Sequence, residues 1–301
     1  DIVLVNVDAP PAVVYVDDAT NFNLGHAPTA NEYILDADFG TAGNQEAVFG
    51  YNAFTNLQDA IDAVAVGGVI VVNAGTYLDP ATLNKAATLK LTAGADATIA
   101  QLDSIAGSAI DLGANVLTLG DASPLHTLAG TITGAGRLIK TGSGALVLSG
   151  ANDYAGGTTV DAGALRAENA TGSATGSGAV AVNAGAVLAG SGSISGQVDV
   201  ANTAAVSPGL ADAGSGVLTR GKTTFVAGAS FVVQLNDYAV GTGYDRLNVV
   251  GEVDLGGATL VATRASSFVP ADGTQFLLID NDGADLVNGE FAGLIEGATV
   301  T

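Results

Sequence analysis

The chain of 301 residues is 48% hydrophobic and contains 42 glycines, which is enough apolar side chain for a folded core with frequent turns. Its 30 acidic residues against 9 basic ones give a formal net charge of −21, which excludes nucleic acid as a partner because such a surface repels phosphate. The absence of cysteine excludes disulfides and thiolate metal sites. No apolar run reaches the roughly 18 residues of a membrane span, so we expect no direct membrane insertion.

The beginning of the chain is predicted to be a cap. β-Branched runs at residues 2–7 and 13–16, separated by two prolines, predict strands, and a loop-like stretch continues through residues 26–28. We expect residues 1–68 to form this N-terminal cap.

A single helix is predicted at the end of the cap. Apolar residues recur at helical spacing over residues 54–64, with Thr55 available near the N-cap. Gly67 and Gly68 end this helix, and residues 69–72 are predicted to form a short buried strand.

A short motif recurs through the rest of the chain, with copies that begin at Leu91, Ile110, Val160, Val182 and Val200. The last three copies start 22 and 18 residues apart, which is typical of a solenoid with one coil per repeat. Stacked coils bury continuous columns of Val, Leu and Ala. The pattern therefore predicts an all-β fold: a right-handed parallel β-helix with one short N-terminal capping helix. We expect residues 69–301 to form its coils, with a weak domain boundary near residues 207–209.

Two regions resemble known surface proteins. The sequences VYVDD at residues 14–18, NAFTNLQDAIDA at 52–63 and VNAGTY at 72–77 resemble the N-terminal cap of pectin-lyase-like β-helices. The sequences GAGRLIKTGSGALVLSGANDY at 134–154 and GGTTVDAGAL at 156–165 resemble the autotransporter-associated β-strand repeat of passenger-type bacterial surface proteins. This resemblance implies an exported β-helical stalk or adhesin, located outside the cell or on its surface.

One turn offers metal-type ligands. Asp280, Asn281 and Asp282 present alternating oxygen ligands before a glycine, as a calcium loop does. The twelfth position of that loop is Phe291 and not the bidentate glutamate of a calcium hand, so a plain hairpin turn is the competing interpretation. A structural calcium is the only cofactor that the sequence suggests.

Paired carboxylates and histidines are candidates for catalytic groups. The pairs Asp17/Asp18 and Asp36/Asp38 suggest polysaccharide hydrolysis or lyase chemistry, or else solvated turn carboxylates. The nine basic residues are scattered, whereas enzymes acting on acidic polysaccharides need Lys or Arg to hold the uronate. His26 and His126 lie in loop-like sequences without a second histidine, so we predict no catalytic residues.

Residues 216–223 match the P-loop pattern, but a strand-like run follows them where a phosphate-binding helix should begin. The segment is therefore predicted to be a strand, a turn and a strand.

The sequence thus favours a non-catalytic structural or adhesive segment of a secreted surface protein. Unpaired strand edges at the ends of a solenoid predict self-association, for which residues 2–7 are a candidate donor strand. The alternative is a polysaccharide-binding or polysaccharide-degrading β-helix module. A glycan or another ligand on a host or cell surface is the expected partner.

Overall fold

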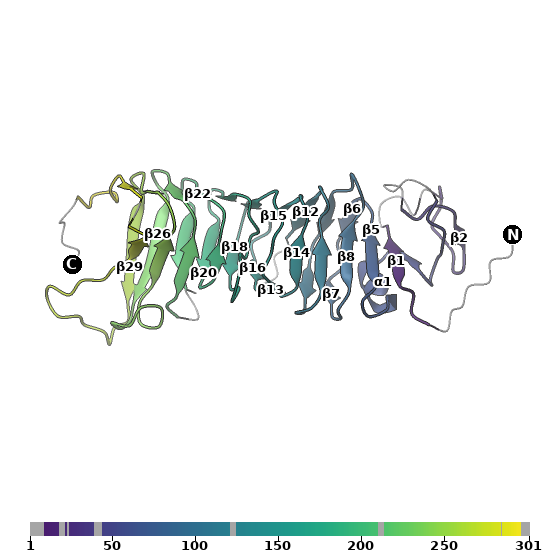
Figure 1. Ribbon diagram of the computed structural model, residues 1–301, viewed down its shortest axis with the longest axis horizontal. Helices are drawn as coiled ribbons and strands as arrows, with labels where there is room; N and C mark the ends of the chain where they lie inside the picture. Colours follow the sequence, from purple (N-terminus) through teal and green to yellow (C-terminus); the bar gives the residue numbers. More distant parts are fainter. Residues whose placement is uncertain are drawn as a thin grey trace.

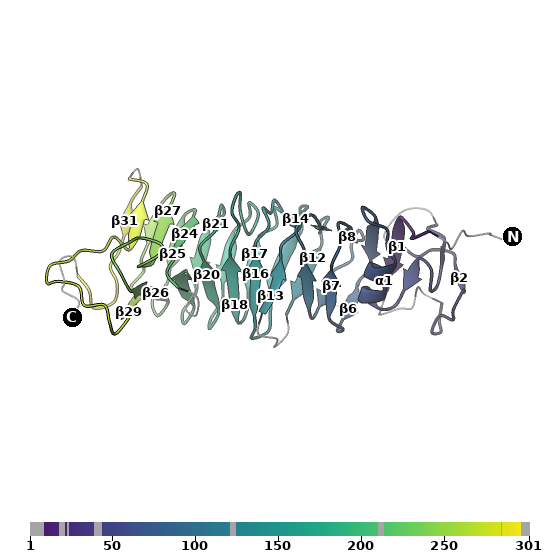
Figure 2. The same cartoon turned by 90° about the horizontal axis from the view of Figure 1, so that it is seen from below.

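The computed structural model describes residues 9–17, 22, 24–38, 44–120, 125–209, 214–283 and 285–295. Its coils stack along one axis into an elongated rod, with the N-terminal cap at one end and the last strands at the other (Figure 1). A perpendicular view gives the same elongated outline (Figure 2). The predicted parallel β-helix is confirmed.

Two long sheets run along the rod. The ten-stranded sheet contains β6 (Gly75–Tyr77), β9 (Ala97–Ile99), β12 (Val116–Leu119), β15 (Arg137–Lys140), β17 (Thr158–Val160), β19 (Val180–Val182), β22 (Val198–Val200), β25 (Thr223–Phe225), β28 (Val253–Asp254) and β31 (Val287–Asn288). The nine-stranded sheet contains β7 (Ala81–Leu83), β10 (Leu102–Ser104), β13 (Leu125–Leu128), β16 (Ala145–Leu148), β18 (Ala164–Ala167), β20 (Val187–Gly190), β23 (Ala205–Pro208), β26 (Ser230–Leu235) and β29 (Thr259–Arg264).

The third side of the rod is divided between two shorter sheets. The six-stranded sheet, nearest the cap, contains β1 (Val13–Val16), β4 (Ala53–Phe54), β5 (Val69–Val72), β8 (Thr88–Leu91), β11 (Ala109–Asp111) and β14 (Thr131–Thr133). The four-stranded sheet, at the other end, contains β21 (Ser193–Ile194), β24 (Val217–Arg220), β27 (Arg246–Val249) and β30 (Ile279–Asn281). The cap adds an antiparallel pair, β2 (Tyr33–Ile34) with β3 (Ala47–Val48).

Equivalent strands of successive coils pair in parallel. Val160, Val182 and Val200, the starts of three predicted repeats, face one another directly in β17, β19 and β22. Each residue therefore stacks on its equivalent at the spacing of about 4.8 Å between neighbouring strands. The prediction of one coil per repeat is confirmed for this part of the chain.

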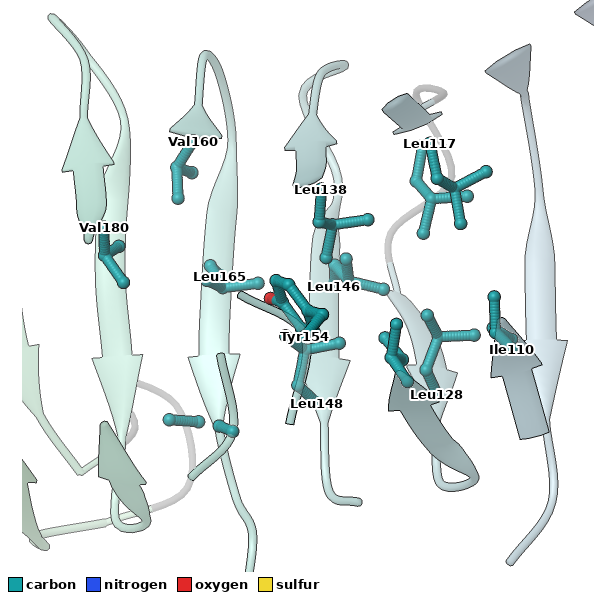
Figure 3. Close-up of a cluster of buried hydrophobic side chains, with 14 of the residues drawn as sticks. Ile110, Leu117, Leu128, Leu138, Leu146, Leu148, Tyr154, Val160, Leu165 and Val180 are labelled. Carbon is teal, nitrogen blue, oxygen red and sulfur yellow. The ribbon is translucent and has the colours of Figure 1, made fainter. Parts of the chain in front are cut away.

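Inward-pointing aliphatic side chains form one continuous core. In the nine-stranded sheet, a buried column runs through Leu146, Leu165, Leu188, Val206 and Phe231. Figure 3 shows the first two of these residues beside Leu148 and Tyr154, all directed into the interior. The same core cluster extends from Val14 in β1 to Ala258 before β29.

The helix α1 (Leu57–Ala63) covers the first coils and is shorter than the predicted span of 54–64. Asn56, and not Thr55, is its N-cap, because the Asn56 side chain accepts hydrogen bonds from the amides of Gln58 and Asp59. Phe54 lies in β4, which pairs with β1, so sheet pairing replaces the first predicted helical turn. The predicted boundaries and cap residue were therefore wrong.

Candidate functional site

In the middle of the rod, side-chain hydrogen bonds take the place of strand pairing on the third side. Between β14 and β21, where the six-stranded sheet has ended and the four-stranded one has not begun, the third side is irregular. Asn152 spans three coils there, since its Oδ1 accepts from the Ile132 amide at 2.7 Å and its Nδ2 donates to the Ala174 carbonyl. One coil further, Asn169 Oδ1 accepts from the Ser193 amide at 2.9 Å.

Tyr154 anchors the same irregular segment from inside. Its side chain is fully buried, and its hydroxyl forms a hydrogen bond with Oγ1 of Thr158. Burial raises the pKa of Tyr154, so the hydroxyl stays protonated at physiological pH. Tyr154 is thus a structural group and not a proton donor available to solvent.

The outer face of the ten-stranded sheet presents a column of short side chains, one from each strand. In register these are Thr76, Thr98, Thr118, Ile139, Thr159, Ala181, Asp199, Thr224, Asp254 and Asn288. Ala181 is the smallest of them, and it lines a shallow, open groove. Asn183, Asp199, Thr224 and Val226 also line this groove, which we call the Ala181 groove.

The predicted calcium turn lies at the C-terminal end of the four-stranded sheet. Asp280 forms an ion pair with Arg246, with 3.2 Å between Oδ2 and Nη1. Asn281 donates from Nδ2 to the Asp285 carbonyl and accepts from the Asp282 amide. One carboxylate is therefore already neutralised by a cation. Calcium binding at Asp280, Asn281 and Asp282 stays a prediction.

The acidic pairs of the sequence lie in the cap. Asp17 is fully buried, and its Oδ2 accepts from the Phe22 amide at 2.8 Å. Asp36 and Asp38 face Tyr15, whose pKa is raised by burial and by the charges of Asp38 and Asp36. Asp18 lies outside the described residues. The carboxylates that the structure places together are thus Asp36 and Asp38, in the cap loop and away from the Ala181 groove.

The two histidines are far apart along the rod. His26 lies 3.4 Å from Glu32 in the exposed cap loop. His126 lies 3.3 Å from Asp103 and lines a very small pocket. Lys140, at the same pocket, donates to the carbonyls of Thr141, Gly142 and Ala162, so its ammonium is held by backbone.

The P-loop pattern forms a strand, a turn and a strand, as predicted. Its residues belong to β24 and β25, with Gly221 and Lys222 between them. Arg220 points into the core, where it is fully buried, and no described residue forms a hydrogen bond with Nε, Nη1 or Nη2. This buried guanidinium is a feature that the sequence analysis missed.

Across the described part of the chain, no three His, Cys, Asp or Glu side chains gather in a way that would hold a metal ion. In the same residues, no helix is both long enough and apolar enough to cross a membrane.

Comparisons with known proteins place the irregular segment in a known repeat. Residues 138–167, from β15 to β18, match the family model described as Passenger-associated-transport-repeat. The chain is also 41% identical over 98 residues to the Adhesin BmaC autotransporter of Brucella suis biovar 1 (strain 1330). That alignment covers 33% of this chain and 3% of the relative. These matches bear out the predicted autotransporter resemblance and indicate a secreted protein of the cell surface, whereas the pectin-lyase-like character of the cap stays a prediction.

Proposed function

We propose that the chain is a non-catalytic structural and adhesive segment of a secreted bacterial surface protein. The observation that carries this proposal is the uninterrupted stack: one sheet of ten strands and one core cluster from Val14 to Ala258. Such a solenoid holds its outer faces at fixed spacing along a rigid axis. The match to an adhesin autotransporter supports attachment as the purpose of those faces.

Adhesion is tested with the purified chain coupled to beads. We expect the beads to bind host cells or a glycan array more strongly than beads that carry an unrelated acidic protein. A polysaccharide panel assayed for reducing-sugar release is expected to remain intact. Sugar release by the chain would overturn the non-catalytic assignment, and absence of all binding would overturn the adhesive one.

A second candidate is a glycan-binding module, which the Ala181 groove favours. Asn183, Asp199 and Thr224 offer hydrogen-bonding side chains around a small residue, and glycans are held by such groups. Ala181→Phe fills the groove without removing any polar group, and Thr118→Phe places the same ring elsewhere on that face. Loss of glycan binding in Ala181→Phe alone supports this function, and equal binding in both variants contradicts it.

We also propose that copies of this chain associate with one another through their strand edges. β29 is the last strand of the nine-stranded sheet, and its second edge pairs with no strand in the described residues. A second copy would complete this edge by strand addition. The candidate donor at residues 2–7 lies outside the described residues. Negative-stain images should show end-to-end polymers that Val261→Lys disperses, and monomers at high concentration would argue against assembly.

A further inference from the structure

The cap loop packs against the N-terminal end of the six-stranded sheet, at β1 and β4. Its own small core consists of Phe22, Ile34, Ala37, Ala47 and Ala53, and Tyr15 of β1 packs against it. Two hydrogen bonds fix the segment 36–38 within this layer. The Ala37 amide donates to the Gln45 carbonyl at 2.8 Å, and Nδ2 of Asn73, the residue after β5, donates to the Ala37 carbonyl at 3.0 Å.

Oxygen acceptors surround this segment. Asp38 is 7% exposed, and Oδ1 of Asp36 accepts two long hydrogen bonds from described residues, 3.3 Å from the Asp38 amide and 3.5 Å from the Gln45 amide. Both carboxylates are close enough to Tyr15 to raise the pKa of its hydroxyl. Two negative charges are therefore held beside a partly buried aromatic ring.

Two amide oxygens at the same segment have no hydrogen-bond partner among the described residues. Oδ1 of Asn73 and Oε1 of Gln45 are both buried without a hydrogen bond, although Asn73 is only 3% exposed. The orientation of the Asn73 amide follows from its Nδ2 bond to Ala37, so its oxygen is the atom left unpaired. A buried acceptor without a donor or a cation is costly, and such atoms are rare in folded proteins.

The sequence supplies no basic side chain for these charges nearby along the chain. The first 84 residues contain eleven Asp or Glu and neither Lys nor Arg, since the first basic residue is Lys85. The charges of Asp36 and Asp38 are therefore not matched by a Lys or Arg close to them in the sequence.

We propose that Asp36, Asp38, Gln45 and Asn73 bind a divalent cation of the calcium class. Calcium takes six to eight oxygen ligands from carboxylates, amide carbonyls and water, and two carboxylates balance its charge. Only two of these four ligands are acidic, and the other two are amides. The site therefore does not contain three His, Cys, Asp or Glu side chains, and no such group of three occurs in the described residues. The ion would tie the cap loop to the end of β5 and so fasten the cap to the first coil.

Terbium luminescence tests the site directly. Tb³⁺ replaces calcium and is sensitised by nearby tyrosine, and the chain contains no tryptophan to obscure this signal. We expect tyrosine-sensitised emission that CaCl2 displaces and that Tyr15→Phe lowers, with Tyr77, whose hydroxyl donates to the Asn73 carbonyl, sensitising the remainder. Tyr238→Phe, at the other end of the rod, is expected to retain it. Tyr15→Phe leaves every proposed ligand in place, so its loss of emission does not depend on a ligand variant folding.

Calorimetry with CaCl2 then identifies the ligands. Asp38→Asn and Asn73→Ala are expected to weaken calcium binding by roughly tenfold or more. Asp280→Asn, in the calcium turn suggested by the sequence, should leave the affinity of the cap site unchanged. The proposal would be overturned if Tyr15→Phe left the emission undiminished. It would also be overturned if Asp280→Asn lost calcium binding while Asp38→Asn retained it. Binding of MgCl2 with equal affinity would overturn the assignment to calcium.

Discussion

Arg220 is the least satisfied side chain of the core. It lies fully buried, with Cζ over the ring of Phe225, 5.5 Å from the ring centroid. Burial lowers the pKa of Arg220 to about 9, because the charged form loses its hydration. A guanidinium without hydrogen-bond partners in this position opposes folding.

Replacing Arg220 is therefore expected to stabilise the protein. Arg220→Met keeps most of the side-chain volume and removes the charge, so the free energy of unfolding should rise by about 1–4 kcal/mol. Urea denaturation measures the change. Arg246→Met serves as the control, since it removes a residue that has an ion pair with Asp280 and should not stabilise. A less stable Arg220→Met would show that the guanidinium has a counterion in solution.

Tyr154 gives a pH-dependent prediction. Its folded-state pKa is raised by burial above the ordinary value of 10.0, so it favours folding below pH 10.0 and this contribution is lost as pH rises further. Tyr154→Phe should cost about 0.5–1.5 kcal/mol at neutral pH through the lost Thr158 bond. The variant and the parent should converge above pH 10.0 in urea titrations, and a constant difference across this pH range would contradict the argument.

At the scale of single elements, glycines end strands where another strand runs very close. Gly190, the last residue of β20, has φ of 115°, and a Cβ there would overlap the carbonyl oxygen of Ala167 in β18. Gly185 also has positive φ, at 79°, but a Cβ there would meet nothing. The two positions share the backbone conformation and differ in the space available.

This contrast predicts unequal costs for the same substitution. Gly185→Ala should destabilise by about 1–2 kcal/mol through left-handed backbone strain alone. Gly190→Ala should cost a further 1–3 kcal/mol or so, because a backbone carbonyl in a paired strand cannot move aside. Thermal unfolding of the two variants measures the difference. Equal destabilisation would mean that β18 and β20 can separate at this point.

The elements also show what the sequence could and could not predict. Val160, Val182 and Val200 predicted stacked strands correctly because a coil repeats its inward residues at a regular period. The start of α1 was misjudged because pairing of β4 with β1 overrides the helical spacing at Phe54. Gln45 and Asn73 were missed as candidate ligands because only the fold brings these distant residues to Asp36 and Asp38.

At the scale of the whole molecule, charge and shape act together. A net charge of −21 on one rod creates self-repulsion that opposes compact stacking. Salt at physiological concentration screens charges beyond about 8 Å, so the unfolding temperature should rise from low salt to 0.15 M NaCl or so. Differential scanning calorimetry measures this rise. A falling temperature would indicate that attractive ion pairs, such as Lys222 with Glu252, dominate the surface.

The direction of the strand pairing has a mechanical consequence. Hydrogen bonds between successive coils run along the rod, and the first and last described coils lie at opposite ends of it (Figure 1). A pulling force applied along this axis would act on every row of bonds at once, because the rows lie in series, so that the coil with the weakest row separates first. The rod would lengthen stepwise under flow and shorten again when the drag is released.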